Sequence, residues 1–104
     1  MKLIELNIQR IKDLCRRYKV KTLAVFGSIL TDRFNEQSDV DLLVTFEPHD
    51  PDNPSEFDYV GNYFGLKDAF EQLFNRQVDL IEEEGLRNKY LIRNINRTKQ
   101  LIYG

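Results

Sequence analysis

The sequence contains few of the residues and segments that mark several common protein classes. Its only cysteine, Cys15, cannot form an internal disulfide, which argues against a disulfide-stabilised secreted domain. No apolar run approaches the roughly 20 residues of a membrane span, and the N-terminus lacks the apolar segment of a signal peptide. No Ser–His or Cys–His pair is visible, so nothing indicates a covalent enzyme intermediate. These features predict a soluble, cytoplasmic protein that does not bind membranes.

Proline is confined to one short segment. All three prolines lie between residues 48 and 54, together with the only histidine, His49. Prolines at this spacing exclude regular secondary structure, so residues 48–55 are predicted to form a loop. A solvent-exposed histidine in such a loop is far more common than a catalytic base or a metal ligand. We therefore place His49 outside the candidate site.

The net charge is only −2, yet charges of opposite sign are segregated along the chain. Residues 1–33 carry eight Lys/Arg and three Asp/Glu, residues 34–85 carry two and fourteen, and residues 86–104 carry five and none. Two interpretations are open: solvated faces on the terminal helices, or basic ends that help to hold triphosphate, RNA or an acidic partner. The balance gives no indication of a dedicated DNA-binding protein.

Apolar periodicity divides the chain into helices and short strands. Helices are predicted over residues 3–18, 29–33, 59–74 and 88–99, and strands over residues 20–26, 39–46, 77–81 and 101–103. Residues 35–38 and 75–76 are predicted turns, and residues 82–84 a solvated acidic loop. The side chains expected to be buried on the three longer helices are Ile4, Ile8, Ile11 and Cys15; Tyr63, Leu66, Phe70, Leu73 and Phe74; and Leu91, Ile92 and Ile95.

Two carboxylates interrupt an otherwise apolar strand. Asp39 and Asp41 precede Leu42, Leu43 and Val44, although aspartate is depleted in strands and an unpaired buried charge is costly. Side chains alternate along a strand, so both carboxylates point to one face, roughly 6–7 Å apart along the strand, and repel each other. A divalent cation would remove that repulsion. Mg²⁺ takes hard oxygen ligands, often one or two carboxylates plus substrate phosphates.

Gly27 and Ser28 follow the preceding apolar strand. They lie directly before the short helix expected over residues 29–33. Glycine lets a ligand approach the backbone closely, and the Ser28 hydroxyl with the backbone N–H groups at a helix start provides donors for a phosphate. A phosphate site beside a two-carboxylate metal site is what transfer from a nucleoside triphosphate requires.

These residues resemble a known signature. Gly27-Ser28, ten further residues and then Asp39-x-Asp41 is the pattern of the DNA-polymerase-β-like nucleotidyltransferase superfamily. The short chain is similar to its minimal nucleotidyltransferase (MNT) branch, and the resemblance extends to residues 78–81 and 90–103. It implies an α/β (α+β) nucleotidyltransferase fold, with a small mixed β-sheet and helices packed against it. The whole chain, residues 1–104, is expected to form a single minimal nucleotidyltransferase domain.

The resemblance gives a role to one more acidic residue. Asp79 lies in the strand expected over residues 77–81 and faces away from Val78 and Leu80, as the two other aspartates face away from their apolar neighbours. In the family this position holds the third carboxylate; an ordinary charge on an exposed strand face is the alternative. The resemblance therefore implies ATP as substrate and two Mg²⁺ ions, whose ligands are also the catalytic residues: Asp39, Asp41 and Asp79.

The chain departs from the family shortly after Gly27-Ser28. Many relatives carry an Arg-Gly pair where this chain has Thr31-Asp32, and an aspartate is unfavourable beside a phosphate. Arg33 is expected to substitute for the missing arginine. The nucleotide-binding residues implied by the resemblance are thus Gly27, Ser28 and Arg33.

The resemblance also implies a partner. MNT proteins are commonly encoded beside a HEPN-domain RNase toxin, for which they act as the antitoxin by transferring AMP from ATP to a tyrosine. The chain is thus expected to be a Mg-dependent protein adenylyltransferase that forms a hetero-oligomer with a HEPN-domain toxin. Two alternatives stay open: a binding-only antitoxin without turnover, and the catalytic half of a small-molecule or RNA nucleotidyltransferase. Three intact carboxylates argue against the first, and the lack of a substrate-binding domain argues against the second.

Overall fold

The computed structural model describes residues 1–48 and 58–104. His49 and most of the loop predicted over residues 48–55 lie outside these ranges, so that prediction is not tested. None of the helices in the described ranges is both long enough and apolar enough to span a membrane.

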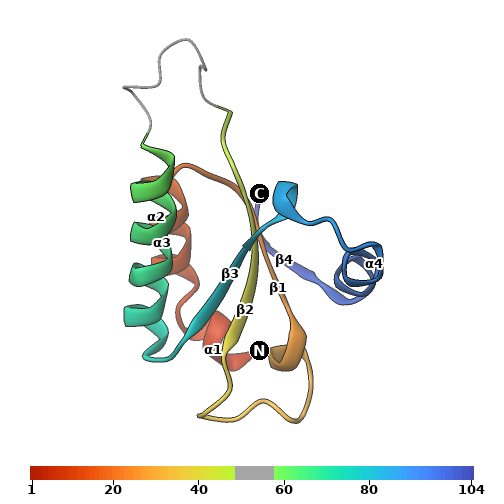
Figure 1. Ribbon diagram of the computed structural model, residues 1–104. Helices are drawn as coiled ribbons and strands as arrows, with labels where there is room; N and C mark the ends of the chain where they lie inside the picture. Colours follow the sequence, from red (N-terminus) through yellow and green to blue (C-terminus); the bar gives the residue numbers. More distant parts are fainter. Residues whose placement is uncertain (49–57) are drawn as a thin grey trace.

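A mixed β-sheet forms the centre of the described structure (Figure 1). Its four strands lie in the order β3-β2-β1-β4. β2 pairs antiparallel with β1 and parallel with β3, while β4 pairs antiparallel with β1. The predicted mixed sheet and the predicted edge strand at the C-terminus are therefore confirmed. The strand bounds are β1 Val20–Phe26, β2 Val40–Phe46, β3 Val78–Glu82 and β4 Gln100–Tyr103.

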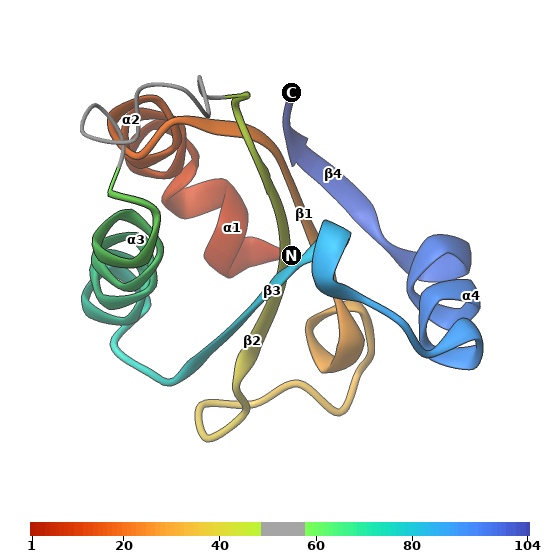
Figure 2. The same ribbon diagram turned by 45° about the horizontal axis from the view of Figure 1, so that its top comes forward.

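Helices cover the two faces of the sheet unequally. α1 (Lys2–Leu6), α2 (Ile8–Arg17) and α3 (Tyr59–Phe74) pack on one face, and α4 (Lys89–Thr98) lies on the other (Figures 1 and 2). The first face forms the larger core, in which Ile11, Leu23, Leu42, Leu66 and Phe70 are buried. The α4 face forms a smaller core of Ala24, Phe26, Leu43 and Ile95. The α4 face is thus only partly covered, which leaves room there for a polar site.

The predicted helix over residues 3–18 is wrong in one respect, because it breaks at Asn7. Asn7 has φ −114° and ψ 12°, and it separates α1 from α2. Its side-chain amide donates to the Leu3 carbonyl at 2.9 Å, which competes with the regular helical hydrogen bonds. Cys15 is fully buried in the core, as predicted, and burial raises the pKa of its thiol to about 12.

The helix predicted over residues 29–33 and the loop predicted over residues 82–84 also need correction. The first is a short 3-10 helix, η1 (Gly27–Leu30), which begins two residues earlier and is closed by the Thr31 hydroxyl on the Ser28 carbonyl at 2.8 Å. In the second region, Glu82 is the last residue of β3 and η3 (Glu83–Gly85) follows it. Sequence periodicity cannot detect helices of three or four residues, because one turn contains too few positions.

The two longer helices after β2 begin and end at capping residues. Asp58 accepts a hydrogen bond from the Gly61 N–H at 3.0 Å and begins α3, and Asn75, with φ 53°, ends it. Asn88 caps α4 in the same way. Leu66, Phe70 and Phe74 are buried as predicted, whereas Tyr63 and Leu73 are only half-buried. On α4 the prediction for Leu91 is wrong, because that side chain is 40% exposed.

Candidate active site

Two of the predicted site residues are direct neighbours across the sheet. Asp41 on β2 is in register with Asp79 on β3, and on its other side Asp41 is in register with Phe26 on β1. Cross-strand partners point to the same face of a sheet, so the two carboxylates share one face. Asp39 lies two residues before Asp41, on the approach to β2. We call Asp39, Asp41 and Asp79 the carboxylate group.

The carboxylate group lies at one end of the face that α4 covers. Leu43, two residues beyond Asp41 and therefore on the same face, packs in the smaller core with Ile95 of α4. This end of β2 is also the end at which η1 follows β1 (Figures 1 and 2). The fold therefore brings the Gly-Ser segment and the carboxylates together, as the sequence predicts.

The electrostatics of the group centre on Asp41. Asp39 and Asp79 are exposed, whereas Asp41 is half-buried. Burial raises the pKa of Asp41, and the neighbouring charges of Asp79 and Asp39 raise it further. A hydrogen bond from the Ser28 backbone N–H lowers the pKa but does not reverse the shift. Without a cation, the folded protein thus opposes ionisation of Asp41.

Gly27 is required by its contact with Asp41. Its φ is +77°, a left-handed conformation that residues with a side chain rarely adopt. A β-carbon at this position would lie 2.1 Å from Asp41 Oδ2, far inside van der Waals contact. The glycine therefore does two things: it turns the chain from β1 into η1, and it makes room for the Asp41 carboxylate.

The other nucleotide-binding predictions have different structural outcomes. The Ser28 backbone N–H is engaged by Asp41, so the Ser28 hydroxyl is the donor left for a phosphate. Asp32 and Arg33 are both exposed in the loop after η1. In the described part of the chain, the Arg33 guanidinium forms no ion pair with the carboxylate group. The Arg33 backbone bonds to Thr31 and Asn35, but its guanidinium has no hydrogen bond to any residue that the structure describes.

A hollow of about 480 Å³ opens beside Gly27. It is lined by Gly27, Leu30, Thr31, Thr98 and Gln100, and its size lies within the range of small-ligand pockets. Sequence reasoning did not single out Thr98 or Gln100. No local signal could reveal them, because Gln100 reaches η1 through the pairing of β4 with β1, and Thr98 through the contact of α4 with η1.

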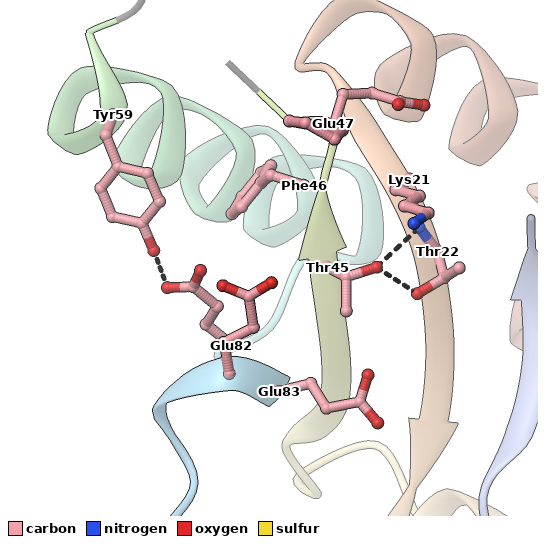
Figure 3. Close-up of a pocket in the computed structure, with 10 residues that line it drawn as sticks. Lys21, Thr22, Thr45, Phe46, Glu47, Tyr59, Glu82 and Glu83 are labelled. Carbon is pink, nitrogen blue, oxygen red and sulfur yellow. Dashed lines mark hydrogen bonds between the residues drawn. The ribbon is translucent and has the colours of Figure 1, made fainter. Parts of the chain in front are cut away.

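A second hollow, of about 450 Å³, lies at the other end of β2 (Figure 3). Four glutamates line it: Glu47, Glu82, Glu83 and Glu84. The Tyr59 hydroxyl donates to Glu82, and burial, followed by the charge of Glu84, raises the pKa of Glu82. Such a surface repels a triphosphate, so we place the nucleotide at the carboxylate group and not here.

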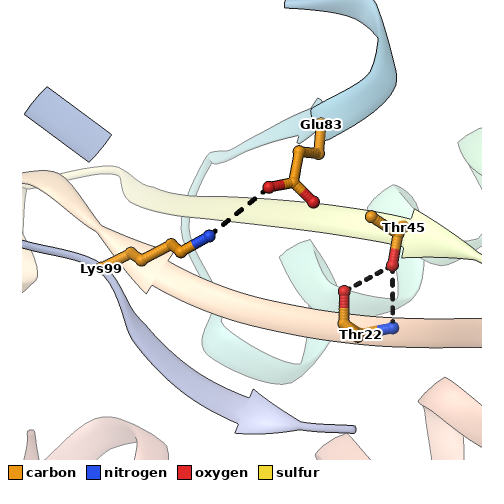
Figure 4. A network of polar contacts seen from close by, with 4 residues as sticks. All are labelled: Thr22, Thr45, Glu83 and Lys99. Carbon is orange, nitrogen blue, oxygen red and sulfur yellow. Dashed lines mark hydrogen bonds and ion pairs between the residues drawn. The ribbon is translucent and has the colours of Figure 1, made fainter. Parts of the chain in front are cut away.

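The residues near this second hollow have structural contacts of their own (Figure 4). Lys99 pairs with Glu83 at 3.4 Å, and this ion pair joins the end of α4 to η3. The Thr22 and Thr45 hydroxyls bond to each other across β1 and β2. Glu82 and Glu83 are half-buried and bonded to Tyr59 and Lys99, whereas Glu84 is exposed, so the predicted solvation describes Glu84 best.

The carboxylate group fits a divalent cation that brings further ligands with it. Its donors are hard oxygens, and Asp41 carries an uncompensated electrostatic cost that a cation would relieve. Among the residues that the structure describes, no three His, Cys, Asp or Glu side chains are gathered closely enough to hold a metal ion by themselves. The fit is therefore to an ion shared between carboxylates and substrate phosphates.

Comparison with known proteins agrees with this geometry. The family model of the nucleotidyltransferase domain matches residues 8–102. The chain belongs to this nucleotidyltransferase family. A nucleotidyltransferase relative from Methanocaldococcus jannaschii, named "Putative protein adenylyltransferase", is 35% identical over 105 residues, which cover 93% of this chain and 97% of that protein.

Solved structures give the same result for the fold. A structure named "Structure of putative minimal nucleotidyltransferase" matches with a TM-score of 0.73 and 29% identity, covering 95% of this chain and 92% of that one. A chain of the complex between tri-AMPylated Shewanella oneidensis HEPN toxin and MNT antitoxin matches with a TM-score of 0.64 and 19% identity, covering 96% and 71%. The second likeness shows the fold alone. The predicted nucleotidyltransferase fold is confirmed.

Proposed function

We propose that this nucleotidyltransferase transfers AMP from ATP to a hydroxyl acceptor, and that the acceptor is a tyrosine of a HEPN-domain toxin for which the chain is the antitoxin. One observation carries the proposal: Asp41 and Asp79 are in register on one face of the sheet, with Gly27 packed against Asp41. This arrangement puts two carboxylates beside the β1–η1 turn, where the exposed Gly27 also lines a hollow.

The carboxylates are proposed to hold two Mg²⁺ ions. Asp39 and Asp41 would bind one ion together with the triphosphate. Asp79 and Asp41 would bind the other, on the side of the acceptor. When bound, Mg²⁺ supplies charge neutralisation on the phosphates and a lower pKa for the attacking hydroxyl. The acceptor oxygen forms a bond to the α-phosphorus, the bond from that phosphorus to the pyrophosphate oxygen breaks, and the hydroxyl proton leaves to solvent or a carboxylate.

The other residues of the site position the nucleotide. The Ser28 hydroxyl is proposed to donate to a phosphate oxygen, while its backbone N–H holds the Asp41 carboxylate in place. Gly27 keeps the space between η1 and Asp41 free of a side chain. Arg33, exposed in the loop after η1, is proposed to approach the triphosphate, and it compensates for the nearby charge of Asp32.

A protein acceptor fits the open side of the site. Asp79 lies on β3, which is an edge strand, and its side chain is exposed. A large partner can therefore approach the carboxylate group from the β3 side and form the missing wall of the site. The names of the similar proteins support the same class of acceptor, since one is called a protein adenylyltransferase and another is an MNT antitoxin in complex with an AMPylated toxin.

Calorimetry of ATP binding, first in EDTA and then in Mg²⁺, tests the metal-dependent part of the proposal. The carboxylate group alone repels a polyanion, so tight binding is expected only with Mg²⁺. Asp39→Asn should lose the metal-dependent part of the affinity while the protein remains folded, because Asp39 is exposed. Equal affinity for ATP in EDTA and in Mg²⁺ would rule out the proposed role of the carboxylates.

A further inference from the structure

We propose that Arg76 is a positioning residue for the active site: it holds the turn that leads into Asp39 against the segment that leads into Asp79. The inference rests on the proposed function, because it concerns how the carboxylate group is presented to Mg²⁺ and ATP. Arg76 lies between α3 and β3, where sequence reasoning predicted only a turn. It is 37 positions from Asp39 in the sequence, so only the fold reveals the connection.

The guanidinium of Arg76 donates two hydrogen bonds to the turn before Asp39. Its Nη1 atom donates to the Asn35 carbonyl at 2.8 Å and to the Ser38 carbonyl at 3.0 Å. The Ser38 carbonyl belongs to the peptide bond that joins Ser38 to Asp39. Fixing this peptide plane restricts the backbone dihedral angles at Asp39, and therefore the direction of its carboxylate.

Hydrogen bonds within the turn hold its residues together, so that the two bonds from Arg76 act on the turn as a whole. The Asn35 carbonyl accepts from the Ser38 N–H at 3.1 Å as well as from Arg76. The Asn35 side chain accepts from the Gln37 N–H at 2.8 Å, and the Ser38 hydroxyl accepts from the Asn35 N–H. The turn is thus a small closed unit, and the two bonds from Arg76 fix the orientation of the whole unit.

The backbone of Arg76 leads directly into β3. Directly after Arg76, the Gln77 carbonyl accepts from the Val40 N–H at 3.1 Å, and this bond begins the pairing of β2 with β3. The Val78 N–H, in turn, donates to a carboxylate oxygen of Glu71 on α3. Arg76 therefore joins the backbone before Asp39 to the backbone before Asp79, at the point where the two strands begin to pair.

The chemistry of the contact favours arginine over lysine. The Arg76 guanidinium lies 4.8 Å from the centre of the Phe34 ring, a cation–π distance, and Phe34 directly precedes the same turn. Its Nε atom is buried and has no hydrogen-bond partner among the described residues. Lysine lacks the planar guanidinium that lies over Phe34, and its ammonium sits on a flexible stem, so it would orient the two carbonyls less firmly.

A purely structural role for Arg76 makes a different prediction from a positioning role. If Arg76 only stabilises the turn, its loss should lower the melting temperature and weaken ATP binding by the same factor at every Mg²⁺ concentration. If Arg76 positions Asp39, its loss should raise the Mg²⁺ concentration needed for ATP binding. Excess Mg²⁺ should then restore the affinity, because a misdirected ligand weakens metal binding without removing it.

The experiment measures ATP binding to the full chain by calorimetry across a Mg²⁺ titration. For Arg76→Gln we expect the half-maximal Mg²⁺ concentration to rise about 10-fold, the lower end of the range for residues that orient metal ligands, with the wild-type ATP affinity regained at saturating Mg²⁺. Arg76→Lys, which keeps the charge, should show the same shift in a smaller degree and serves as the test if Arg76→Gln does not fold.

Arg87→Gln is the matched control. Its Nη1 atom also donates to two backbone carbonyls, those of Glu84 at 2.8 Å and Leu86 at 3.2 Å, but its loop carries no member of the carboxylate group. The Mg²⁺ requirement of this control should stay at the wild-type value. An unchanged Mg²⁺ requirement in both Arg76 variants, with metal-dependent binding in the wild type, would overturn this inference alone. A wild type that binds ATP without any metal dependence would overturn the proposed function as well.

Discussion

Gly27 and Asp41 are in such close contact that a β-carbon on Gly27 would lie 2.1 Å from Asp41 Oδ2. Gly27→Ala should therefore displace the Asp41 carboxylate. It should also lower the free energy of unfolding by about 1–2 kcal/mol, the cost of a left-handed conformation in a residue with a side chain. Chemical denaturation measures the stability, and calorimetry measures the expected loss of Mg²⁺-dependent ATP binding.

Gly85→Ala is the control for this substitution. A β-carbon on Gly85 would meet no atom within 4 Å, and its φ is not in the left-handed region. The control should keep both stability and ATP binding. If Gly27→Ala bound Mg²⁺ and ATP like the wild type, the contact between Gly27 and Asp41 would have no role in the site.

Asp41→Asn should stabilise the metal-free protein at neutral pH. Burial and the charges of Asp79 and Asp39 raise the pKa of Asp41 in the folded protein above its ordinary value of 3.8. The folded state therefore binds the proton more tightly than the unfolded state does, and ionisation of Asp41 costs stability. Asparagine removes this cost and still offers an oxygen to the Ser28 N–H.

The pH dependence gives the sign of this effect. The stability that protonated Asp41 contributes is complete below its unfolded pKa and is lost as the pH rises through its raised folded pKa. Thermal melts in EDTA should show that the stability of Asp41→Asn increases relative to that of the wild type as the pH rises from about 3 to 7. Glu82 has a raised pKa in both proteins, so its contribution to the pH dependence cancels when the stabilities of the two proteins are subtracted. A variant that is less stable by the same amount at every pH would contradict the electrostatic interpretation.

Cys15 should be unreactive in the folded protein. Its side chain is fully buried, and burial raises the pKa of the thiol to about 12. Near pH 8.5, where an exposed thiol is half ionised, a thiol-specific disulfide reagent should react only as fast as the protein unfolds. Rapid labelling without denaturant would show that α2 opens locally from the sheet.

The parts of the fold that sequence predicts well are those with a strong local signal. α3 begins at Tyr59 and ends at Phe74 as predicted, because a 16-residue apolar periodicity lies between a capping aspartate and a left-handed asparagine. The strands agree to within one residue at each end. The shared face of Asp41 and Asp79 was predictable because the two-residue period of a strand fixes which side chains point together.

The features that sequence did not predict depend on long-range contacts or on very short elements. The break at Asn7 depends on one side-chain hydrogen bond to Leu3, and η1 has only four residues. The exposure of Leu91 follows from how little of α4 the sheet covers. Arg76 bonds to the turn before Asp39, which precedes α3 in the sequence, whereas Arg76 follows α3. No local sequence pattern could therefore predict this contact.

AMP transfer to a protein hydroxyl is the central claim, and intact-mass spectrometry tests it most directly. Purified protein is incubated with Mg²⁺, ATP and a HEPN-domain toxin, and the masses of both chains are measured. The toxin should become heavier by one or more AMP units. With Asp41→Asn the mass should not change, although the complex should still form, because a whole interface does not depend on one carboxylate.

The result that would contradict this claim is equally specific. If the wild type neutralises the toxin without any change in mass, and Asp41→Asn neutralises it equally well, the protein is a binding-only antitoxin. If AMP appears on RNA or a small molecule and never on protein, the nucleotidyltransferase chemistry is correct and the antitoxin assignment is wrong. An AMP-modified toxin with the wild type, and an unmodified toxin with Asp41→Asn, is the result that we predict.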